Sequence, residues 1–317
     1  MKKVLITGAL GQIGTDLSEA LVIKLGTQNV ISCYHHKKPE VMDGSRGLYE
    51  QLDATKPGEI DKLIEKHQID TIVHMASLLS ATAEKNPMFA WDVNMNGLIN
   101  VLEAGRKYKA SVFNPSSIAV FGPDSPQDNT PQDTILRPTS IYGVTKVSGE
   151  LLSDYYFKKY QVDVRGLRYP GLISYKTEPG GGTTDYAVAI YFDAILNGSY
   201  TCYLREDTSI DMMYMPDAIK ATIDLMEADG SKLKHRNAFN VSAMAFTPAQ
   251  IAKSIQKVMP SFTIKYDVDP VRQAIADSWP NSIDDSAARA EWGWKHEYDL
   301  DAMTQDMLEN LKKILKK

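Results

Sequence analysis

The sequence predicts an α/β protein with a Rossmann-like doubly wound parallel sheet and a smaller C-terminal α/β substrate lobe. Three observations lead to this prediction. Short apolar runs of strand length alternate with longer helical patterns through the first half of the chain. These runs are apolar at consecutive positions, as expected for parallel strands that are covered on both faces. A glycine-rich turn at residues 8–14 also joins the first strand to the first helix.

The expected elements follow a strand–helix rhythm through the first half of the chain. The expected strands are residues 4–7, 29–33, 48–52, 71–75, 111–115 and 162–167. The expected helices are residues 12–25, 57–67, 87–107 and 140–159, with an amphipathic helix at 300–317 closing the chain. Ligands bind at the carboxyl ends of the strands in such a sheet. We expect a dinucleotide-binding domain at 1–168 and a mainly substrate-binding lobe at 169–317, with some segments returning to the core.

Composition and charge argue against several classes of protein. Of the 317 residues, 43% are hydrophobic and 24% are charged, which is typical of globular proteins. The formal charge of −5 comes from interspersed acids and bases, so we expect no nucleic-acid partner. No run has the length of a membrane span and the first residues lead directly into a strand. We therefore expect a cytoplasmic protein with no membrane partner and no signal peptide. Cys33 and Cys202 lack metal-ligand spacing, and His35-His36 lack a third ligand, so no metal site is expected.

The glycine turn predicts a cofactor. Glycine there permits a tight turn, a close approach of the backbone to a pyrophosphate, and close packing of the helix on the strand. The free amides at the start of the helix would then face the phosphates. The spacing G-x-x-G-x-x-G is one residue longer at its first gap than the common dinucleotide motif. The residues expected to bind a nicotinamide dinucleotide are Gly8, Gly11, Gln12, Ile13 and Gly14.

The end of the second expected strand departs from the usual pattern. An acidic residue is expected there, where it would bind the adenine ribose. This chain has Tyr34 instead, followed by His35-His36-Lys37-Lys38. A basic segment can accommodate a 2′-phosphate, so NADP stays open beside NAD, which is the expected cofactor. Asp53, at the end of the third strand, is a candidate contact to the adenine amino group.

Tyr142 and Lys146 predict the catalytic chemistry. The spacing Tyr-x-x-x-Lys places a phenol and an ammonium one helical turn apart. A nearby cation lowers the pKa of tyrosine, which can then act as a general base near neutral pH. The same spacing occurs twice more, at Tyr34/Lys38 and Tyr155/Lys159. Tyr142 alone begins a helix beside the end of the fifth strand, where Ser117 supplies a hydroxyl. We expect Ser117, Tyr142 and Lys146 to form a hydride-transfer site.

Five motifs resemble the extended short-chain dehydrogenase/reductase family. They are Gly8-x-x-Gly11-x-x-Gly14, His74-Met75-Ala76-Ser77, Ser117-x-x-Val120-Phe121-Gly122, Tyr142-x-x-x-Lys146 and Arg168-Tyr169-Pro170-Gly171. Further segments resemble the NAD-dependent L-threonine 3-dehydrogenases of the sugar-epimerase-like type. These are residues 167–175, 182–188, 212–218, 278–280 and 291–293. Members of that type usually carry an aspartate at the position of Tyr34.

The narrower resemblance implies a reaction and roles for the three catalytic residues. It implies that the β-hydroxyl of L-threonine is oxidised to 2-amino-3-oxobutanoate, with hydride transfer to NAD. Tyr142 would take the hydroxyl proton, and Ser117 would hydrogen-bond the same oxygen. Lys146 would bind the nicotinamide ribose and lower the pKa of Tyr142.

The same resemblance implies further contacts and an assembly. Ser80, Thr184 and Trp279 would line the amino-acid pocket, together with Ser117 and Tyr142. Ala76 and Tyr169 would contact the cofactor. The loop at residues 180–182 would act as a lid that excludes water. The helices at 87–107 and 140–159 would pair two chains into a homodimer.

Several of these residues have a simpler structural interpretation. Trp279 can pack between the lobes, and Thr184 with Asp185 can cap the helix that opens at Tyr186. His74 lies inside an apolar strand, so we expect a core histidine.

Two other functions compete with the dehydrogenase. A nucleotide-sugar 4-epimerase is the alternative on the same scaffold, although residues 177–207 offer few cations for a nucleotide. A dehydratase would need acids at the positions of Ile118 and Ala119. A dinucleotide-sensing regulator would not need the Tyr142/Lys146 pair.

Overall fold

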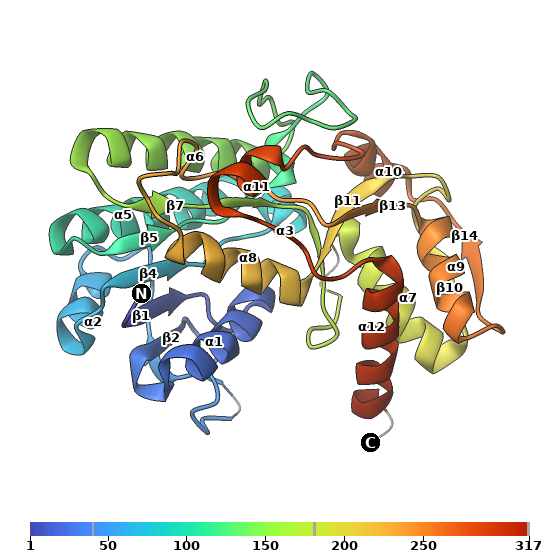
Figure 1. Cartoon of the computed structure of the whole chain (residues 1–317), viewed down its shortest axis with the longest axis horizontal. Helices are drawn as coiled ribbons and strands as arrows, with labels where there is room; N and C mark the ends of the chain where they lie inside the picture. Colours follow the sequence, from blue (N-terminus) through green and yellow to red (C-terminus); the bar gives the residue numbers. More distant parts are fainter. Residues whose placement is uncertain (40, 180–181, 316–317) are drawn as a thin grey trace.

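A six-stranded parallel sheet forms the centre of the computed structural model, which describes residues 1–39, 41–179 and 182–315 (Figure 1). Its strands are β1 (Val4–Thr7), β2 (Val30–Tyr34), β3 (Leu48–Gln51), β4 (Thr71–His74), β5 (Ser111–Phe113) and β7 (Val164–Arg165). They lie in the order β3-β2-β1-β4-β5-β7, and all neighbours are parallel. The strand order reverses between β1 and β4, and a crevice at the carboxyl ends is expected at such a point.

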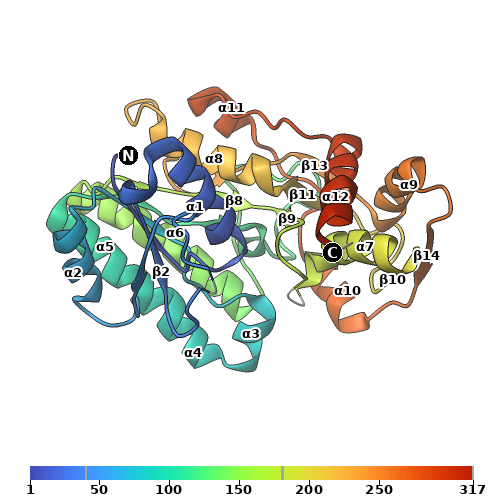
Figure 2. The same cartoon turned by 90° about the horizontal axis from the view of Figure 1, so that it is seen from below.

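Helices cover both faces of this sheet (Figures 1 and 2). These helices are α1 (Gln12–Leu25), α2 (Glu59–His67), α5 (Gly97–Tyr108), α6 (Ile141–Tyr160) and α8 (Met215–Glu227). Val4 and Ile6 of β1 belong to the core that includes residues of α1 and α8. Leu5 belongs to the core on the opposite face, with residues of α2, α5 and α6. Alternate side chains of one strand thus enter two cores, which confirms the doubly wound parallel sheet.

Three smaller sheets accompany the central sheet. Two of them lie in a second lobe beyond its carboxyl edge (Figure 1), and the one that contains Leu167 and Phe239 packs in the same core as Val4 and Ile6. The strands of these three sheets are β6 (Ser116–Ser117), β8 (Leu167–Tyr169) and β12 (Phe239–Asn240); β9 (Gly171–Ile173), β11 (Ile210–Tyr214) and β13 (Met244–Phe246); and β10 (Ser199–Cys202) and β14 (Thr263–Tyr266). The helices of this half, besides α8, are α7 (Tyr186–Asn197), α9 (Pro248–Val258), α10 (Pro270–Asp277), α11 (Ser286–Trp292) and α12 (Leu300–Leu315). Buried residues of α7, α9 and α12 share a third core with Phe121 and Ile173.

The second half of the chain also contributes to the first lobe. Met213, Met215 and Trp294 pack in the same core as Val4 and Ile6. The expected boundary at residue 168 falls inside β8.

The long helix expected at residues 87–107 is interrupted. It consists of α4 (Pro87–Trp91), a π-helical turn at Asp92–Asn96, and α5. A short helix, α3 (Ser80–Lys85), precedes it where none was expected. The strand expected at 162–167 is also divided, because β7 joins the central sheet and β8 joins β6 and β12. Residues 77–80 and 116–117 lie at the carboxyl edge of the central sheet, because they follow β4 and β5 in the chain.

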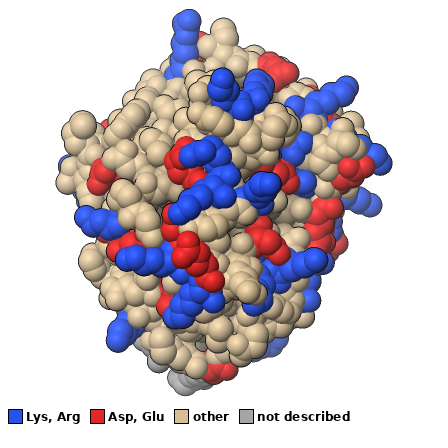
Figure 3. Space-filling model, turned by 90° about the vertical axis from the view of Figure 1, so that its left-hand side faces the viewer, with Lys and Arg blue, Asp and Glu red and all other residues tan. Residues whose placement is uncertain are grey.

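The surface carries charges of both signs. Figure 3 shows the face that lies at the left of Figure 1, where Lys and Arg alternate with Asp and Glu. Lys66 pairs with Glu50 at 2.7 Å, and Lys107 pairs with Asp61 at 2.7 Å. Within the described ranges, no helix combines the length and the apolar character that crossing a membrane requires.

Candidate functional site

The glycine turn lies directly after β1 and packs against the end of β4. Gly8 has a φ of +64°, and a Cβ atom there would lie 2.7 Å from the Ala76 nitrogen. A Cβ on Gly14 would lie 2.5 Å from the Gly8 carbonyl oxygen and 2.8 Å from the Ala9 Cα. Since both close neighbours are backbone atoms, a larger side chain would open the turn. Gly11 precedes α1 as its N-cap and supplies no side chain, so the first amides of this helix stay uncovered by a cap.

This turn fits the pyrophosphate of a dinucleotide. The amides at the start of a helix attract anions through their hydrogens and through the helix dipole. The first turn of α1 contains no acidic residue that would repel a phosphate. Gly8, Gly11, Gln12, Ile13 and Gly14 all line one pocket. The cofactor-binding residues that were expected in this turn therefore share one cavity with the catalytic candidates described next.

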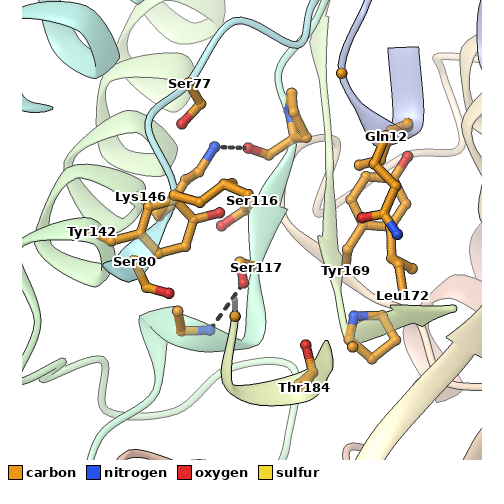
Figure 4. Close-up of a pocket in the computed structure, with 18 of the residues that line it drawn as sticks. Gln12, Ser77, Ser80, Ser116, Ser117, Tyr142, Lys146, Tyr169, Leu172 and Thr184 are labelled. Carbon is orange, nitrogen blue, oxygen red and sulfur yellow. Dashed lines mark hydrogen bonds between the residues drawn. The ribbon is translucent and has the colours of Figure 1, made fainter. Parts of the chain in front are cut away.

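Ser117, Tyr142 and Lys146 meet on the opposite wall of the same pocket (Figure 4). Ser117 ends β6, and its Oγ accepts a hydrogen bond from the Ala119 nitrogen at 3.2 Å. Tyr142 lies in the first turn of α6, which begins there because the Ser140 Oγ accepts from the Gly143 nitrogen at 3.1 Å. One turn later, the Lys146 Nζ donates to the Pro115 carbonyl oxygen at 2.8 Å. Two segments that are distant in sequence thus converge on one point.

The pocket shifts the pKa values of this group through burial. Burial raises the pKa of the Tyr142 phenol to about 12, and its hydrogen bond with Ser117 opposes the shift. Burial also lowers the pKa of Lys146 to about 8, while the charge of Glu150 raises it. Lys146 was expected to lower the pKa of Tyr142, whereas burial raises this pKa. The physical reason is the burial of the phenol; the Lys146 ammonium donates to the Pro115 carbonyl and lies 5.5 Å from the centroid of the Tyr142 ring.

Glu150, one helical turn beyond Lys146, joins several elements of the fold. It is buried and forms a paired contact with Arg168, whose Nη2 lies 2.8 Å from the Glu150 Oε2 and whose Nε lies 2.9 Å from its Oε1. The Ser116 Oγ donates to the same carboxylate at 2.5 Å. Arg168 also donates to the Asn240 Oδ1 at 3.1 Å. This cluster holds α6, β6, β8 and β12 together beneath the catalytic candidates.

His74 is a core residue, as expected. It is buried at the end of β4, and its Nδ1 lies 2.9 Å from the Thr7 Oγ1. Burial and the charge of Lys146 lower the pKa of His74 to about 3, so its imidazole is neutral. The Thr7 Oγ1 also accepts from the Ala76 nitrogen at 3.2 Å. These contacts join the ends of β1 and β4 under the glycine turn.

Asn94, which was not selected from the sequence, supports the wall of the pocket at residues 77–78. Its Oδ1 accepts from the Leu78 nitrogen at 2.8 Å and from the Ser77 Oγ at 3.1 Å. Its Nδ2 donates to the Leu78 carbonyl oxygen at 3.2 Å and to the Thr145 Oγ1 at 3.1 Å. Asn94 lies in the π-helical turn, where it is buried, and such turns are frequent at functional sites. It ties residues 77–78 to α6.

Ser80, Thr184 and Trp279 also line this pocket. Figure 4 shows Ser80 near Tyr142 and Thr184 beyond Ser117. Thr184 lies in the 3₁₀ turn Thr183–Asp185 just before α7. Asp185 caps this turn, because its Oδ2 accepts from the Gly182 nitrogen at 2.8 Å. Of the loop expected to act as a lid, residues 180 and 181 lie outside the described residues.

Three expected cofactor residues do not line the pocket. Tyr34 ends β2, and Asp53 follows β3, where its Oδ1 accepts from the Thr55 Oγ1 at 2.6 Å. Ala76 lies behind the wall and contributes its backbone to the Thr7 contact. Tyr169 does line the pocket, although its hydroxyl bonds to the Thr222 Oγ1.

Other lining residues were not selected from the sequence. They are Met75, Ser77, Leu79, Pro115, Ser116, Ala119, Pro170, Gly171, Leu172, Gly182, Thr183 and Asp185. Most are neighbours of selected residues, so the motifs already contained a signal for them. Leu79 had none, since it lies between a strand end and a helix that was not expected. Among the described side chains, no group of three or more His, Cys, Asp or Glu residues could hold a metal ion.

The fold and this site agree with a family assignment from the sequence. Residues 4–242 match the NAD dependent epimerase/dehydratase family, and the chain belongs to this family, an extended short-chain dehydrogenase/reductase type. It is therefore an NAD-dependent enzyme built around a nicotinamide cofactor.

Particular relatives extend over the full chain. An L-threonine dehydrogenase from Clostridium difficile has 56% sequence identity and a TM-score of 0.97, covering 99% of this chain and 98% of that one. A GalE-like L-threonine dehydrogenase from Cupriavidus necator, solved in its holo form, has 51% identity and a TM-score of 0.94. The match covers 98% of this chain and 100% of that one. An uncharacterized epimerase/dehydratase from Staphylococcus saprophyticus is 57% identical over 309 residues, covering 98% of this chain and 97% of the relative.

Proposed function

We propose that this protein oxidises the β-hydroxyl of L-threonine to 2-amino-3-oxobutanoate, with NAD as the hydride acceptor. The observation that carries the proposal is the pocket that brings Ser117, Tyr142 and Lys146 together with the glycine turn at the switch point of the sheet. The likeness to two proteins named as threonine dehydrogenases, each over nearly the full chain, supports the choice of substrate.

The proposed roles follow from the chemistry of the three side chains. The bound nicotinamide supplies the acceptor for the hydride that leaves the β-carbon. Tyr142 takes the proton of the β-hydroxyl, so the oxygen and carbon are left as a ketone. Ser117 donates a hydrogen bond to the same oxygen and holds it beside the phenol. Positioned proton transfer of this kind accelerates reactions by about 10²–10⁴.

Tyr142 needs a positive charge beside it to act as a base. Burial by itself holds the phenol protonated at neutral pH, since its pKa is raised to about 12. A cation close to a phenol favours the phenolate. Lys146, one helical turn away on α6, is the cation that the chain supplies, and it would also bind the nicotinamide ribose.

The rest of the pocket suits an amino acid better than a nucleotide sugar. Ser80, Thr184 and Trp279 would contact L-threonine beside Ser117 and Tyr142. Within the described part of the chain, Lys146 is the single Lys or Arg in the pocket lining. A nucleotide-sugar 4-epimerase would need further cations for the diphosphate of its substrate.

The proposal includes the two-domain division at 1–168 and 169–317 and a homodimer. Support for the dimer comes from exposed apolar side chains on the helices expected to pair. These side chains are Met88 and Phe89 on α4, Ile99 on α5, and Val144, Leu151 and Tyr155 on α6. Exposed apolar patches mark interaction surfaces in soluble proteins.

The test is the absorbance of reduced nicotinamide with purified protein, NAD and L-threonine. We expect rapid reduction with L-threonine and much slower reduction with L-serine and D-threonine. UDP-galactose and UDP-glucose serve as the probes for an epimerase. Interconversion of these sugars without any reduction by L-threonine would overturn the proposal in favour of the epimerase.

A further inference from the structure

The end of β2 lies beside the glycine turn, where the adenosine half of a dinucleotide is bound in such sheets. β2 lies between β1 and β3, and Tyr34 at its end is in register with Gln51. The Ala9 nitrogen donates to the Cys33 carbonyl oxygen at 3.1 Å, which joins the turn to this strand end. The Leu52 nitrogen donates to the Tyr34 carbonyl oxygen at 2.9 Å. The position of residue 34 relative to the phosphate-binding turn is therefore determined by the backbone.

A carboxylate at this position would accept from the ribose 2′-hydroxyl and repel a 2′-phosphate. Tyr34 occupies it instead, and a phenol carries no such charge. Asp53 lies near, at the end of the next strand, but its carboxylate already has partners. It accepts from the Thr55 nitrogen at 3.0 Å and from the Thr55 Oγ1 at 2.6 Å, and the His35 Nε2 lies 3.6 Å from its Oδ2.

Basic side chains gather next to Tyr34. His35 and His36 lie with their ring centroids 3.6 Å apart, and both are exposed. Lys37 and Lys38 follow, also exposed, so residues 34–38 carry a formal charge of +2 with the histidines neutral. Lysine side chains form charge-assisted hydrogen bonds with phosphate oxygens, and an imidazole N–H can also donate to them. The segment therefore favours an additional phosphate on the ribose.

We propose that residues 34–38 form a binding site for the 2′-phosphate of NADP, so that this enzyme accepts NADP as well as NAD. The proposal depends on the nicotinamide cofactor of the family and is independent of the identity of the substrate. Because residue 34 is not a carboxylate, the site rejects the 2′-phosphate of NADP less strongly than a site with an acidic residue there. The imidazoles and ammonium groups then supply attraction for the phosphate.

Equilibrium binding without any substrate tests this proposal. Dissociation constants are measured by titration calorimetry for NAD and NADP, and for the fragments 5′-AMP and 2′,5′-ADP, which isolate the adenosine end. We expect NADP to bind within about threefold of NAD, and 2′,5′-ADP to bind more tightly than 5′-AMP. A preference for NAD of more than about thirtyfold would overturn the proposal.

Variants separate the effect of the missing carboxylate at residue 34 from the effect of the basic side chains that follow it. Tyr34→Asp should increase the ratio of the NADP constant to the NAD constant by about tenfold or more, because it restores the negative charge. Tyr34→Phe keeps the shape and should leave the ratio within about twofold. The double variant His36→Gln, Lys38→Gln should weaken NADP by about fivefold and leave NAD unchanged. Lys253→Gln on α9 is the matched control for the loss of an exposed lysine charge.

These binding measurements test the phosphate site separately from the proposed oxidation of L-threonine. An unchanged ratio in Tyr34→Asp, or equal weakening of NAD and NADP in the double variant, would contradict the phosphate site. Failure of L-threonine as a substrate would not change these dissociation constants. Absence of binding by both dinucleotides would overturn the phosphate site directly, whatever substrate is later found.

Discussion

At the scale of single residues, the three Tyr-x-x-x-Lys pairs have different environments. Tyr34 ends a strand, and Tyr155 is 50% exposed on α6. Tyr142 lies in the pocket with Ser117, at the start of the same helix. Spacing alone could not choose among them, whereas the position relative to strand ends indicated Tyr142.

Replacing Tyr142 by Phe removes the proposed base and keeps the ring. We expect turnover to fall by a factor of about 10²–10⁴, because no other base is positioned to take the proton of the substrate hydroxyl. The dissociation constant of the dinucleotide should change by less than about twofold, as the ring still fills its place. Tyr155→Phe, on the exposed side of α6, is the matched control and should keep full turnover. Steady-state kinetics and binding titrations check both values; normal turnover in the Tyr142 variant would remove this residue from the mechanism.

At the scale of elements, buried Asp211 connects three segments of the second lobe. It lies on β11, and the Ser242 Oγ lies 2.8 Å from its Oδ2. The Ile283 nitrogen donates to the same oxygen at 3.0 Å. Burial raises the pKa of Asp211 to about 7, and the charge of Asp285 adds to the shift, while these hydrogen bonds oppose it. The segment that contains Ile283 also leads back to Trp279 at the pocket.

This pKa predicts a pH-dependent stability. The folded protein binds the Asp211 proton more tightly than the unfolded chain, whose ordinary value is 3.8. Below that value both states are protonated, so the free energy of unfolding does not vary with pH through this group, and its contribution to stability is fully present. As pH rises from about 4 to about 7, the folded state alone retains the proton, and the free energy of unfolding decreases. Above pH 7 the decrease is complete, on the order of a few kcal/mol.

Asp211→Asn tests this directly, because the amide keeps the shape and does not titrate. The free energy of unfolding of the variant minus that of the unmodified protein should therefore be larger at about pH 8 than at about pH 5. Urea unfolding at both pH values measures the difference. Equal differences between the two proteins at both pH values would show that Asp211 does not titrate in this range.

At the scale of the whole molecule, the proposed homodimer makes a prediction about α6. Leu151 is 66% exposed on the face of this helix that also carries Val144 and Tyr155. Leu151→Glu would introduce a charge into an apolar contact between chains, and burial of an unpaired charge is costly. We expect light scattering after size-exclusion chromatography to give twice the chain mass for the unmodified protein and the chain mass for the variant.

A matched control lies on the other lobe. Leu196 is 60% exposed on α7, which is far from α6 in Figure 1. Leu196→Glu should leave the mass of the dimer unchanged. If the unmodified protein has the mass of a single chain, or if Leu151→Glu stays dimeric, α6 does not form the interface.

Much of the fold could be predicted because burial leaves a local pattern in the sequence. The strand at residues 4–7 and the helix at 12–25 appear with the bounds expected for them. Continuous apolar strands and a glycine turn are local properties that require no distant partner to be recognised. The Tyr142/Lys146 pair is local in the same sense, since one helical turn separates its members.

The sequence by itself therefore determined the alternation of strands and helices in the first half of the chain, the glycine turn and the choice of catalytic candidates. Tertiary structure decided the rest. The π-helical turn carries Asn94, which bonds to residues 77–78. Lys146 binds the Pro115 carbonyl, and burial raises the pKa of Tyr142. Thr184 and Trp279 reach the pocket from the second lobe. These features arise from contacts between segments far apart in the chain, and only the packing of the folded protein brings those segments together.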